Sequence, residues 1–267
     1  MHRNIKAALL ISTYNWPGAL TKVLSSVRCQ QILPSEVLIA DDGSDEKTAK
    51  LVRAFQKEFP VPLRHFWHPD GGFRKTIIMN QAIAATSCDY IIQIDGDITL
   101  HERFIEDHLS IAEDGYYIKG SRVLLSEKKS KAFLAAEHLT PIKPYSIGIT
   151  NRINALRSLF LADFFTKRRK RSHDLRGCNC AFWKKDFVAV NGYNNDLVGW
   201  GHEDIELAAR FINLGLLQKS VKLQAVCYHL HHTFNERNNE RGNYGKYKEV
   251  VDSGVVRCQN GLNNDAL

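Results

Sequence analysis

The stretch Ile91-Ile92-Gln93-Ile94-Asp95-Gly96-Asp97 decides the fold, because an apolar run ends there in two acidic residues separated by a glycine. The run predicts a buried strand. In an open α/β sheet, ligands bind at the carboxyl ends of the strands. Two neighbouring carboxylates are costly to bury without a cation, so the pair favours a divalent metal with oxygen ligands. Ordinary turns also contain Asp-Gly-Asp, so this motif alone does not establish a site.

Strand and helix patterns alternate on both sides of this stretch. One helix is expected to begin at Pro17, a second to end at Phe55 and a third to span residues 75–85. Strands are expected over 7–12, 36–40, 63–67 and 90–94. Such alternation predicts an α/β fold with a mostly parallel central sheet, right-handed crossovers and helices on both faces.

The second half of the chain has weaker patterns. Further helices are expected over 126–136 and 203–214, the latter ended by Gly215, and further strands over 177–183 and 221–228. The tail over 235–267 is polar and basic, so we expect it to be irregular.

One segment combines apolar and basic residues in an unusual order. The run from Leu156 to Phe165 is rich in Leu and Phe, and Lys167-Arg168-Arg169-Lys170-Arg171 follows it. The segment reads either as a surface helix with a solvated basic end or as a membrane-surface element. We favour the second, in which the apolar side chains enter the interface and the cations meet anionic lipid.

Bulk composition sets wide limits on function. The 267 residues include 36 Lys plus Arg against 29 Asp plus Glu, a net charge of +7. This excess suits a phosphate-bearing ligand, an anionic membrane or a nucleic acid. The six scattered cysteines predict reduced thiols and a cytoplasmic protein. The apolar run at 7–11 is too short for a signal peptide, and no stretch approaches the roughly 20 apolar residues of a membrane span.

Four polar segments occur in order along the chain: Ser12-Thr13-Tyr14-Asn15, Asp41-Asp42-Gly43-Ser44, Asp95-Gly96-Asp97 and Trp200-Gly201-His202-Glu203-Asp204. Together with Asn191-Gly192-Tyr193, the set resembles the nucleotide-sugar glycosyltransferases of the GT-A fold, specifically the large inverting family 2. The last two segments are similar to the branch of bacterial chondroitin polymerases and to the galactosyltransferase-type C-terminal half.

The resemblance covers about residues 5–232 and implies how the chain is organised. It implies a single GT-A domain over 1–234, with a nucleotide-binding half over 1–100 and an acceptor-binding half over 101–234. The apolar and basic segment then belongs to an insertion at about 140–175 in the second half.

The resemblance also implies which residues bind a UDP-sugar donor. Ser12 and Tyr14 would contact the nucleotide, and the Tyr14 ring can stack on the base. Asp42 would accept a hydrogen bond from the uracil N–H, and Arg74 would supply a cation for the nucleotide. Asp95 would meet the ribose or a metal-bound water.

A metal site follows from the same resemblance. Asp97 would bind Mn²⁺ or Mg²⁺ directly, with Asp95 as a second carboxylate, and the ion would assist departure of the nucleoside diphosphate. The family usually adds a late histidine. Among three candidates we favour His229, because it directly follows the predicted last strand, with His232 next and His231 third. These histidines could also be polar residues at a strand end.

The acidic pair after the Gly-Trp-Gly sequence is the expected catalytic centre. Asp204 would act as general base toward the acceptor hydroxyl, and Glu203 would bind sugar hydroxyls. Trp200 would give a sugar an apolar platform, with Gly201 and His202 beside it in the acceptor pocket. His202 stands where related sequences often have a small residue. The alternative for the two acids is simple capping of the helix that follows.

Three other classes of protein compete with a glycosyltransferase. A nucleotidyltransferase could use a similar sheet, but its usual glycine-rich, basic loop is missing after Ser12. A phosphatase of the haloacid dehalogenase type would use Asp95 as nucleophile and Asp97 beside it, although that class places the motif on its first strand. A basic nucleic-acid binder would leave the acidic clusters unexplained. We therefore expect no nucleic-acid partner, and the phosphatase remains the alternative to a glycosyltransferase.

The sequence thus predicts an inverting, metal-dependent glycosyltransferase at the inner face of the cytoplasmic membrane. It would move a hexose or N-acetylhexosamine from a UDP-sugar to a saccharide or lipid-linked saccharide. The resemblance and the lack of a Golgi-type membrane anchor place this reaction in bacterial surface-polysaccharide assembly (lipopolysaccharide, O-antigen or capsule).

Overall fold

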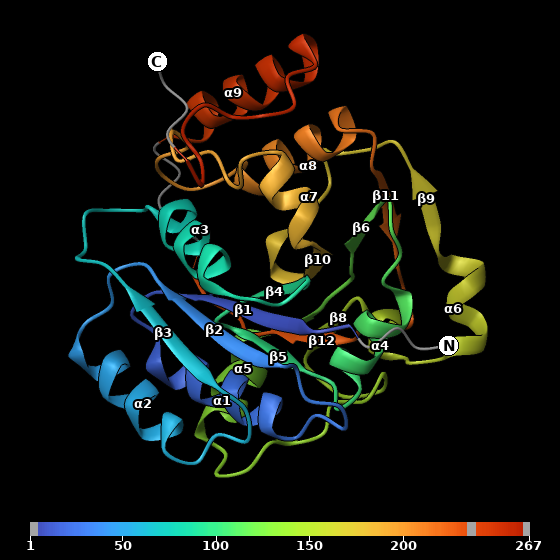
Figure 1. Cartoon of the computed structure of the whole chain (residues 1–267). Helices are drawn as coiled ribbons and strands as arrows, with labels where there is room; N and C mark the ends of the chain where they lie inside the picture. Colours follow the sequence, from blue (N-terminus) through green and yellow to red (C-terminus); the bar gives the residue numbers. More distant parts are fainter. Residues whose placement is uncertain (1–4, 234–238, 264–267) are drawn as a thin grey trace.

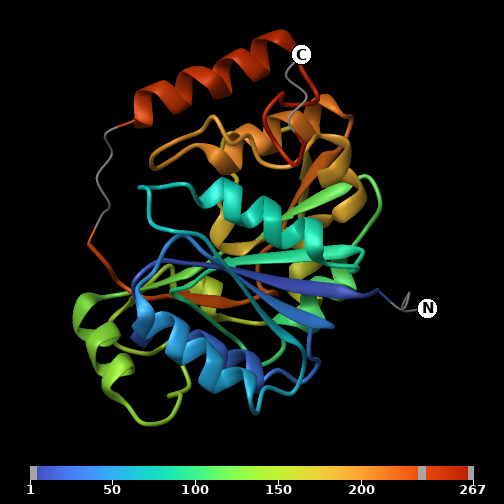
Figure 2. The same cartoon turned by 60° about the vertical axis from the view of Figure 1, so that its left-hand side comes forward.

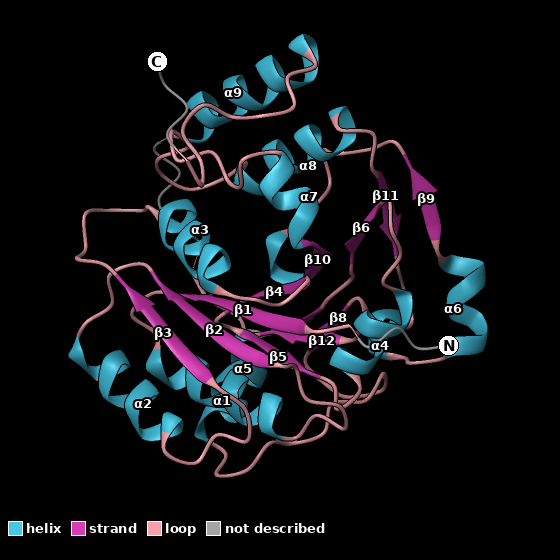
Figure 3. Cartoon of the chain, viewed as in Figure 1, coloured by secondary structure: helices cyan, strands magenta, loops and turns pink. Residues whose placement is uncertain are grey.

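A computed structural model describes residues 5–233 and 239–263, which form two sheets with helices around them (Figure 3). The larger sheet has eight strands in the order β3 (Leu63–Trp67), β2 (Glu36–Asp41), β1 (Ala7–Thr13), β4 (Tyr90–Asp95), β10 (Cys180–Trp183), β6 (Tyr116–Lys119), β11 (Leu217–Ser220) and β9 (Lys167–Arg169). The smaller sheet has four strands in the order β5 (Ile98–Leu100), β12 (Cys227–His229), β7 (Val123–Leu125) and β8 (Ile149–Thr150).

The first four strands of the chain are parallel, as predicted. In their register Ser12 lies opposite Asp95, and Thr13 lies opposite Asp41. The polar residues that end these strands therefore meet at one edge of the sheet. Beyond β4 the sheet is mixed, because β10 runs antiparallel to both β4 and β6.

Helices cover both faces of the larger sheet, which confirms the predicted α/β architecture (Figure 1). One face carries α1 (Pro17–Arg28), α2 (Glu46–Gln56) and α4 (Phe104–Ile111), and the other carries α3 (Lys75–Ala85), α7 (Lys184–Ala189) and α8 (Glu203–Asn213). Alternation along β1 explains both contacts, since Leu9 packs in the first core and Leu10 in the second. Burying each such side chain contributes roughly 1.5–3 kcal/mol.

The smaller sheet joins distant parts of the chain near the Asp-Gly-Asp turn. β12 pairs antiparallel with β5 and parallel with β7, so the residues after β4 lie beside a strand more than a hundred residues further along. Helix α5 (Glu127–Ala135) follows β7, and the Ser126 side chain caps its first turn. The predicted helix over 126–136 is therefore confirmed.

Two predicted strands in the second half are wrong in extent. The last strand was expected over 221–228, but only its final two residues belong to a strand, β12, and residues 221–226 connect β12 to β11, which ends at Ser220. Leu223 and Ala225 between them have φ of +61° and +49°, a left-handed conformation that no strand contains. The strand expected over 177–183 begins only at Cys180, because Gly177–Asn179 forms a 3-10 turn, η2.

The apolar and basic segment also differs from a single surface helix. A 3-10 turn, η1 (Arg152–Ala155), precedes α6 (Leu159–Phe165), and the chain then becomes extended. Lys167–Arg169 forms β9, which pairs antiparallel with β11 at the edge of the larger sheet. Exposed Lys and Arg on an edge strand oppose pairing with another chain.

The tail is irregular only in part of its described residues, because residues 254–263 contain no helix whereas a helix precedes them. Residues 235–238 and 264–267 lie outside the described residues, but Glu240–Ser253 forms α9, which Figure 2 shows lying across the other helices. Tyr247 and Val250 of α9 belong to the same hydrophobic core as Ala208 and Phe211 of α8. Of the helices in the described ranges, not one combines the length and apolar character that a membrane crossing requires.

Candidate active site

Asp95 lies at the carboxyl edge of the sheet and is held there by two donors. The Ser12 hydroxyl donates to Oδ1 of Asp95 at 2.9 Å, and Nζ of Lys75 lies 2.8 Å from the same oxygen. Nζ of Lys75 is also 3.8 Å from Oε1 of Glu203. Burial would raise the pKa of Asp95, but Lys75 outweighs it and holds that pKa below its ordinary value.

Lys75 is the functional residue that the sequence reasoning missed. Burial alone would lower its pKa, but Asp95, Glu203 and Asp204 together hold the pKa well above its usual value, so the side chain stays charged. The signal was its place directly after Arg74 at the start of α3, since side chains of a helix tilt toward its N-terminus. That tilt directs Lys75 toward the edge of the sheet.

Arg74 lies beside Asp42, and its contact with a nucleotide stays a prediction. Its guanidinium donates to the carbonyl oxygen of Pro69, whereas its backbone amide donates to Oδ2 of Asp42 at 3.0 Å. Nε2 of His68 lies 2.7 Å from Oδ1 of Asp42. Burial raises the pKa of Asp42, and His68 opposes the rise. Asp42 is thus fixed at the edge of the sheet, where a base would meet it.

Tyr14 follows β1 and is about half exposed at 52%. Its hydroxyl donates to Oδ2 of Asp70 at 2.9 Å, so the ring is held at the rim on the same side as Asp42. This position suits the predicted stacking on a base.

Asp97, His229 and His232 form a cluster that can hold a divalent metal ion. One ligand atom from each lies within 4.8 Å of the other two. Nε2 of His229 and Nε2 of His232 are 3.2 Å and 3.4 Å from Oδ2 of Asp97. Among the described residues, nothing hydrogen-bonds the buried Oδ1 of Asp97. One carboxylate and two imidazoles with an oxygen left over fit a transition-metal ion such as Mn²⁺.

The structure thus brings both His229 and His232 to Asp97, where the sequence favoured one of them. His231 and Asp95 are not members of this cluster. Oδ1 of Asp95 is instead occupied by Ser12 and Lys75. The role of Asp95 as a direct ligand therefore has no geometric support within the described ranges.

The backbone around Gly96 brings the cluster together. The Gly96 amide donates to the carbonyl of Ser12 at 2.7 Å, and a Cβ at position 96 would lie 2.9 Å from that oxygen. Only glycine permits this approach. The Leu230 amide donates to the carbonyl of Asp97 at 3.0 Å, which places the segment after β12 beside the turn.

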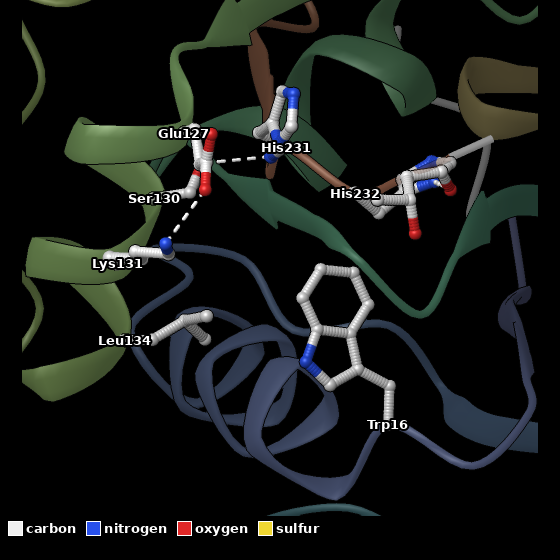
Figure 4. A pocket seen from close by; sticks show the side chains of 8 residues that line it. Trp16, Glu127, Ser130, Lys131, Leu134, His231 and His232 are labelled. Atoms are coloured by element: carbon white, nitrogen blue, oxygen red, sulfur yellow. Dashed lines mark hydrogen bonds and ion pairs between the residues drawn. The ribbon is translucent and has the colours of Figure 1, made fainter.

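A pocket of about 290 Å³ adjoins the metal cluster, and His232 belongs to both (Figure 4). Trp16 and Leu134 contribute apolar surface to it, and Glu127 pairs with Lys131 on its wall. The backbone amide of His231 donates to Ser130 here, so this histidine lies toward α5.

Asp204 has the geometry and the pKa of a general base. The Gly177 amide donates to its Oδ2 at 2.7 Å, while within the described chain Oδ1 is buried without a hydrogen-bond partner. Burial, reinforced by Glu203, raises the pKa of Asp204 to about 7, and Lys75 opposes that rise. A base whose pKa is near neutrality suits proton transfer at physiological pH.

The surroundings of Asp204 are tightly fitted. A Cβ at Gly177 would lie 2.4 Å from Oδ1 of Asp204 and 2.7 Å from Nε2 of Gln93, so only glycine fits there. Gln93 accepts a hydrogen bond from the Tyr193 hydroxyl at 2.8 Å. Gln93 was part of the apolar run in the sequence, and nothing there showed that it lines the site.

The residues expected to bind the acceptor lie at the start of α8 or in the loop before it. Glu203 is buried, and Trp200 and Gly201 lie in the loop before α8. His202 begins α8 with a left-handed φ of +74° and lies beside Tyr244 of α9, with ring centroids 5.3 Å apart. A helix that the sequence did not predict, α9, therefore lies beside the start of α8.

The polar carboxyl ends of the parallel strands, the cluster around Asp97 and the buried carboxylate of Asp204 suit a group-transfer enzyme built on a mixed α/β sheet. Residues 8–183, more than half of the chain, match the family described as Glycosyl transferase family 2, and residues 158–233 match the N-terminal domain of galactosyltransferase. The chain belongs to glycosyl transferase family 2, and it is a glycosyltransferase. The phosphatase alternative is therefore wrong.

Curated relatives include polysaccharide synthases. The chain is 24% identical over 250 residues to the chondroitin synthase of Escherichia coli, covering 88% of this chain and 36% of that protein. It is 22% identical over 256 residues to the hyaluronan synthase of Pasteurella multocida, covering 90% of this chain and 26% of that protein. The chain thus spans about a third or less of the length of these relatives.

Solved structures share the fold at low identity. TarS of S. aureus (residues 1–349) matches with a TM-score of 0.60 and 12% identity, covering 94% of this chain and 65% of that one. GalNAc-T7, crystallised with UDP, GalNAc and Mn²⁺, matches with a TM-score of 0.65 and 15% identity, covering 92% and 48%. These likenesses confirm the predicted GT-A-like fold.

Proposed function

We propose that the protein is an inverting, metal-dependent transferase that moves a hexose or N-acetylhexosamine from a UDP-sugar to a saccharide acceptor. The observation that carries the proposal is the pairing of two sites at one edge. The cluster of Asp97, His229 and His232 suits a metal-bound diphosphate, and the buried carboxylate of Asp204, whose pKa is raised to about 7, would take the proton of an acceptor hydroxyl. The similarity to chondroitin and hyaluronan synthases, and to a structure that holds UDP, supports this class of donor and acceptor.

The reaction would be a single displacement. The acceptor hydroxyl oxygen attacks the anomeric carbon while its proton passes to Oδ1 of Asp204, and the bond from that carbon to the phosphate oxygen breaks with its electron pair leaving on UDP. Attack from the face opposite the phosphate inverts the anomeric configuration. Proton transfer to a positioned base contributes about 10²–10⁴-fold to the rate.

The cations of the site would act on the leaving group. A divalent ion held by Asp97, His229 and His232 would supply Lewis-acid stabilisation of the charge on the diphosphate. Lys75 stays charged between Asp95 and Glu203, and it adds a fixed positive charge near the same group. Its ion pairs also hold these two carboxylates in place, and the pKa of Asp95, which burial would raise, is lowered by this cation.

UDP is the donor nucleotide favoured by the residues at the edge. Asp42 is positioned to accept from the N–H of a uracil ring, and Tyr14 lies at the rim on the same side. The chondroitin and hyaluronan synthases among the relatives, and UDP in a neighbouring structure, agree with this choice. The proposed setting is the assembly of a bacterial surface polysaccharide.

We further propose that the protein works at the inner face of the cytoplasmic membrane. Phe160 and Phe164 are 79% and 76% exposed, and the exposed cations of β9 follow them. Such a combination suits an interface with anionic lipid. β9 is four strands away from β4, so this surface would hold the enzyme at a membrane without contacting the reacting sugar.

The proposed reaction is tested by product analysis. UDP-GlcNAc, UDP-GalNAc, UDP-glucose and UDP-galactose are incubated with Mn²⁺ and a panel of chondroitin, hyaluronan and simple hexoside acceptors. We expect UDP release coupled to a new glycosidic bond of inverted anomeric configuration. A product of retained configuration, or the absence of transfer from every donor, would contradict the proposal.

A further inference from the structure

The loop before α8, residues 198–202, is hydrogen-bonded to side chains at the start of α9. Asn243 of α9 is fully buried, and its Nδ2 lies 3.0 Å from the carbonyl oxygen of Gly201. The same nitrogen is 3.3 Å and 3.4 Å from the carbonyls of Val198 and Gly199. Nδ2 of Asn239 donates to the Val198 carbonyl at 2.7 Å. Two side-chain amides of α9 thus satisfy the carbonyls of this loop.

The loop needs such support because its backbone is unusual. Gly199, Gly201 and His202 have φ of +83°, +104° and +74°. The left-handed conformation of His202 is costly for a residue with a side chain, and it persists only where the surroundings impose it. On the other side of the loop, the Gly199 amide donates to the carbonyl of Phe73 at 3.3 Å. The loop that precedes Asp204 is therefore fixed between two segments far apart in the sequence.

An aromatic side chain of α9 continues the surface of this loop. The rings of His202 and Tyr244 lie 5.3 Å apart, and Tyr244 is 48% exposed. Tyr244 also lies 5.8 Å from the ring of Tyr247, which is buried and fixes the helix. A half-exposed aromatic ring has an apolar face and a polar hydroxyl, which suits the C–H face and the hydroxyls of a sugar.

We propose that α9 completes the acceptor site, with Asn243 positioning the Gly-Trp-Gly loop and Tyr244 contacting the acceptor saccharide. This inference rests on the proposed function, since it takes Asp204 as the base toward which the acceptor hydroxyl points. The saccharide would then extend from Asp204 past His202 onto α9. Asn243 acts through the loop and is a positioning residue.

Hydrogen–deuterium exchange tests the positioning role without any acceptor. In Asn243→Ala, we expect the amides of residues 198–202 to exchange at least about tenfold faster than in the parent protein, while β1 and β4 are unchanged. The matched control is Asn213→Ala. Asn213 also ties α8 to α9, through the carbonyls of Val250 and Val255 at 3.0 Å and 2.8 Å, but it does not touch the loop. Equal protection of the loop in both variants would overturn the positioning role.

Calorimetry tests the sugar contact with the protein loaded with UDP and Mn²⁺. The probes are chondroitin and hyaluronan tetrasaccharides and octyl hexosides. We expect Tyr244→Ala to weaken binding of the tightest probe by about tenfold, and Tyr244→Phe to stay within about twofold of the parent because the ring remains. Unchanged affinity in Tyr244→Ala would overturn the contact.

The two experiments separate this inference from the proposed function. If the parent protein binds UDP with Mn²⁺ but binds none of the saccharides, the sugar contact is wrong for this acceptor class. If it binds neither UDP nor a saccharide, the proposed function itself is wrong. The exchange result remains decisive for Asn243 in both cases.

Discussion

The amide of Gly177 donates a 2.7 Å hydrogen bond to Oδ2 of Asp204, while Oδ1 is buried and, among the described residues, has no hydrogen-bond partner. One carboxylate oxygen is thereby fixed by the short turn before β10, and the other is the oxygen to which we assign the substrate proton. Burial and the charge of Glu203 keep the pKa of this carboxyl near neutrality despite the hydrogen bond. The position of the Asp204 carboxylate is thus set by Gly177, and its raised pKa is set mainly by burial and by Glu203.

The rate of transfer is expected to rise with pH around neutrality. A general base must be deprotonated, and the pKa of Asp204 is raised to about 7, so kcat/KM for the acceptor should increase tenfold per pH unit below about 7 and level off above it. The measurement is a pH–rate profile at saturating donor and Mn²⁺. A profile that is flat between pH 5.5 and 8 would contradict this assignment.

Asp204→Asn provides the control for that profile. It should lose about 10²–10⁴-fold in rate and keep donor binding. The folded-state pKa is above the unfolded value near 3.8, so ionising Asp204 costs stability increasingly from about pH 4 to pH 7. The Asn variant should therefore unfold at a higher temperature than the parent at pH 8.

Asp186 on α7 provides a control for the stability effect, because its pKa is also raised by burial. Asp186→Asn should gain stability at that pH but retain activity.

The histidines after β12 differ in their expected effect on metal binding. Replacing His229 or His232 with Ala removes one ligand from the cluster of Asp97, so each change should weaken Mn²⁺ binding by at least about tenfold. His231→Ala should bind Mn²⁺ as the parent does, because His231 lies on the α5 side. Calorimetric titration with Mn²⁺ alone checks all three, and a loss confined to His231→Ala would refute the cluster.

Replacing Lys75 and replacing Arg74 should affect the affinity for UDP differently, although the two residues are neighbours in the sequence. Lys75→Met leaves Asp95 and Glu203 without their buried cation, and we expect the affinity for UDP with Mn²⁺ to fall about 10–100-fold. Arg74→Met should change it by less than about threefold, since that guanidinium is turned to Pro69 and its backbone amide remains on Asp42. Thermal unfolding of both variants separates loss of folding from loss of binding. If Arg74→Met weakened UDP binding more than Lys75→Met, the assignment of Lys75 as the cation of the site would be wrong.

The contrast between these two residues shows what the sequence could supply. Strands β1 to β4 were predicted to within a residue at each end. β1, β2 and β4 contain apolar runs that end in polar residues, and β3 is a short segment with aromatic residues before a Pro-containing loop. Successive residues of a helix differ in direction by about 100°. The sequence therefore showed two cations at the start of α3, but the position of the helix on the sheet decided that Lys75 enters the site.

The second half of the chain was harder to predict for physical reasons. Positive φ at Leu223 and Ala225 has no signature in residue type, so the break between β11 and β12 could not be seen. α9 has few apolar residues, and packing of Tyr247 and Val250 on α8 stabilises it more than its composition does. The same long-range packing brings Asn243 to the acceptor loop.

Vesicle binding tests the proposed membrane surface. The parent protein should sediment with anionic phosphatidylglycerol vesicles and not with neutral phosphatidylcholine vesicles. The double change Lys167→Ser and Arg169→Ser should weaken binding at least about tenfold, since each cation near such a surface contributes about 1 kcal/mol. Lys50→Ser with Lys57→Ser removes the same charge from exposed positions in the region of α2 and should have little effect. Equal losses in the two double variants would rule out a localised surface.

The central claim is that the protein binds a UDP-sugar through a divalent metal at the edge of the larger sheet where β1, β2 and β4 end. Calorimetry with UDP-, GDP-, dTDP- and CMP-linked sugars, in Mn²⁺ and again in EDTA, tests it most directly. We expect binding only to the UDP-sugars and only with Mn²⁺, and we expect Asp97→Ala to abolish it. Binding that persists in EDTA, or equal binding of all four nucleotides, would contradict the account.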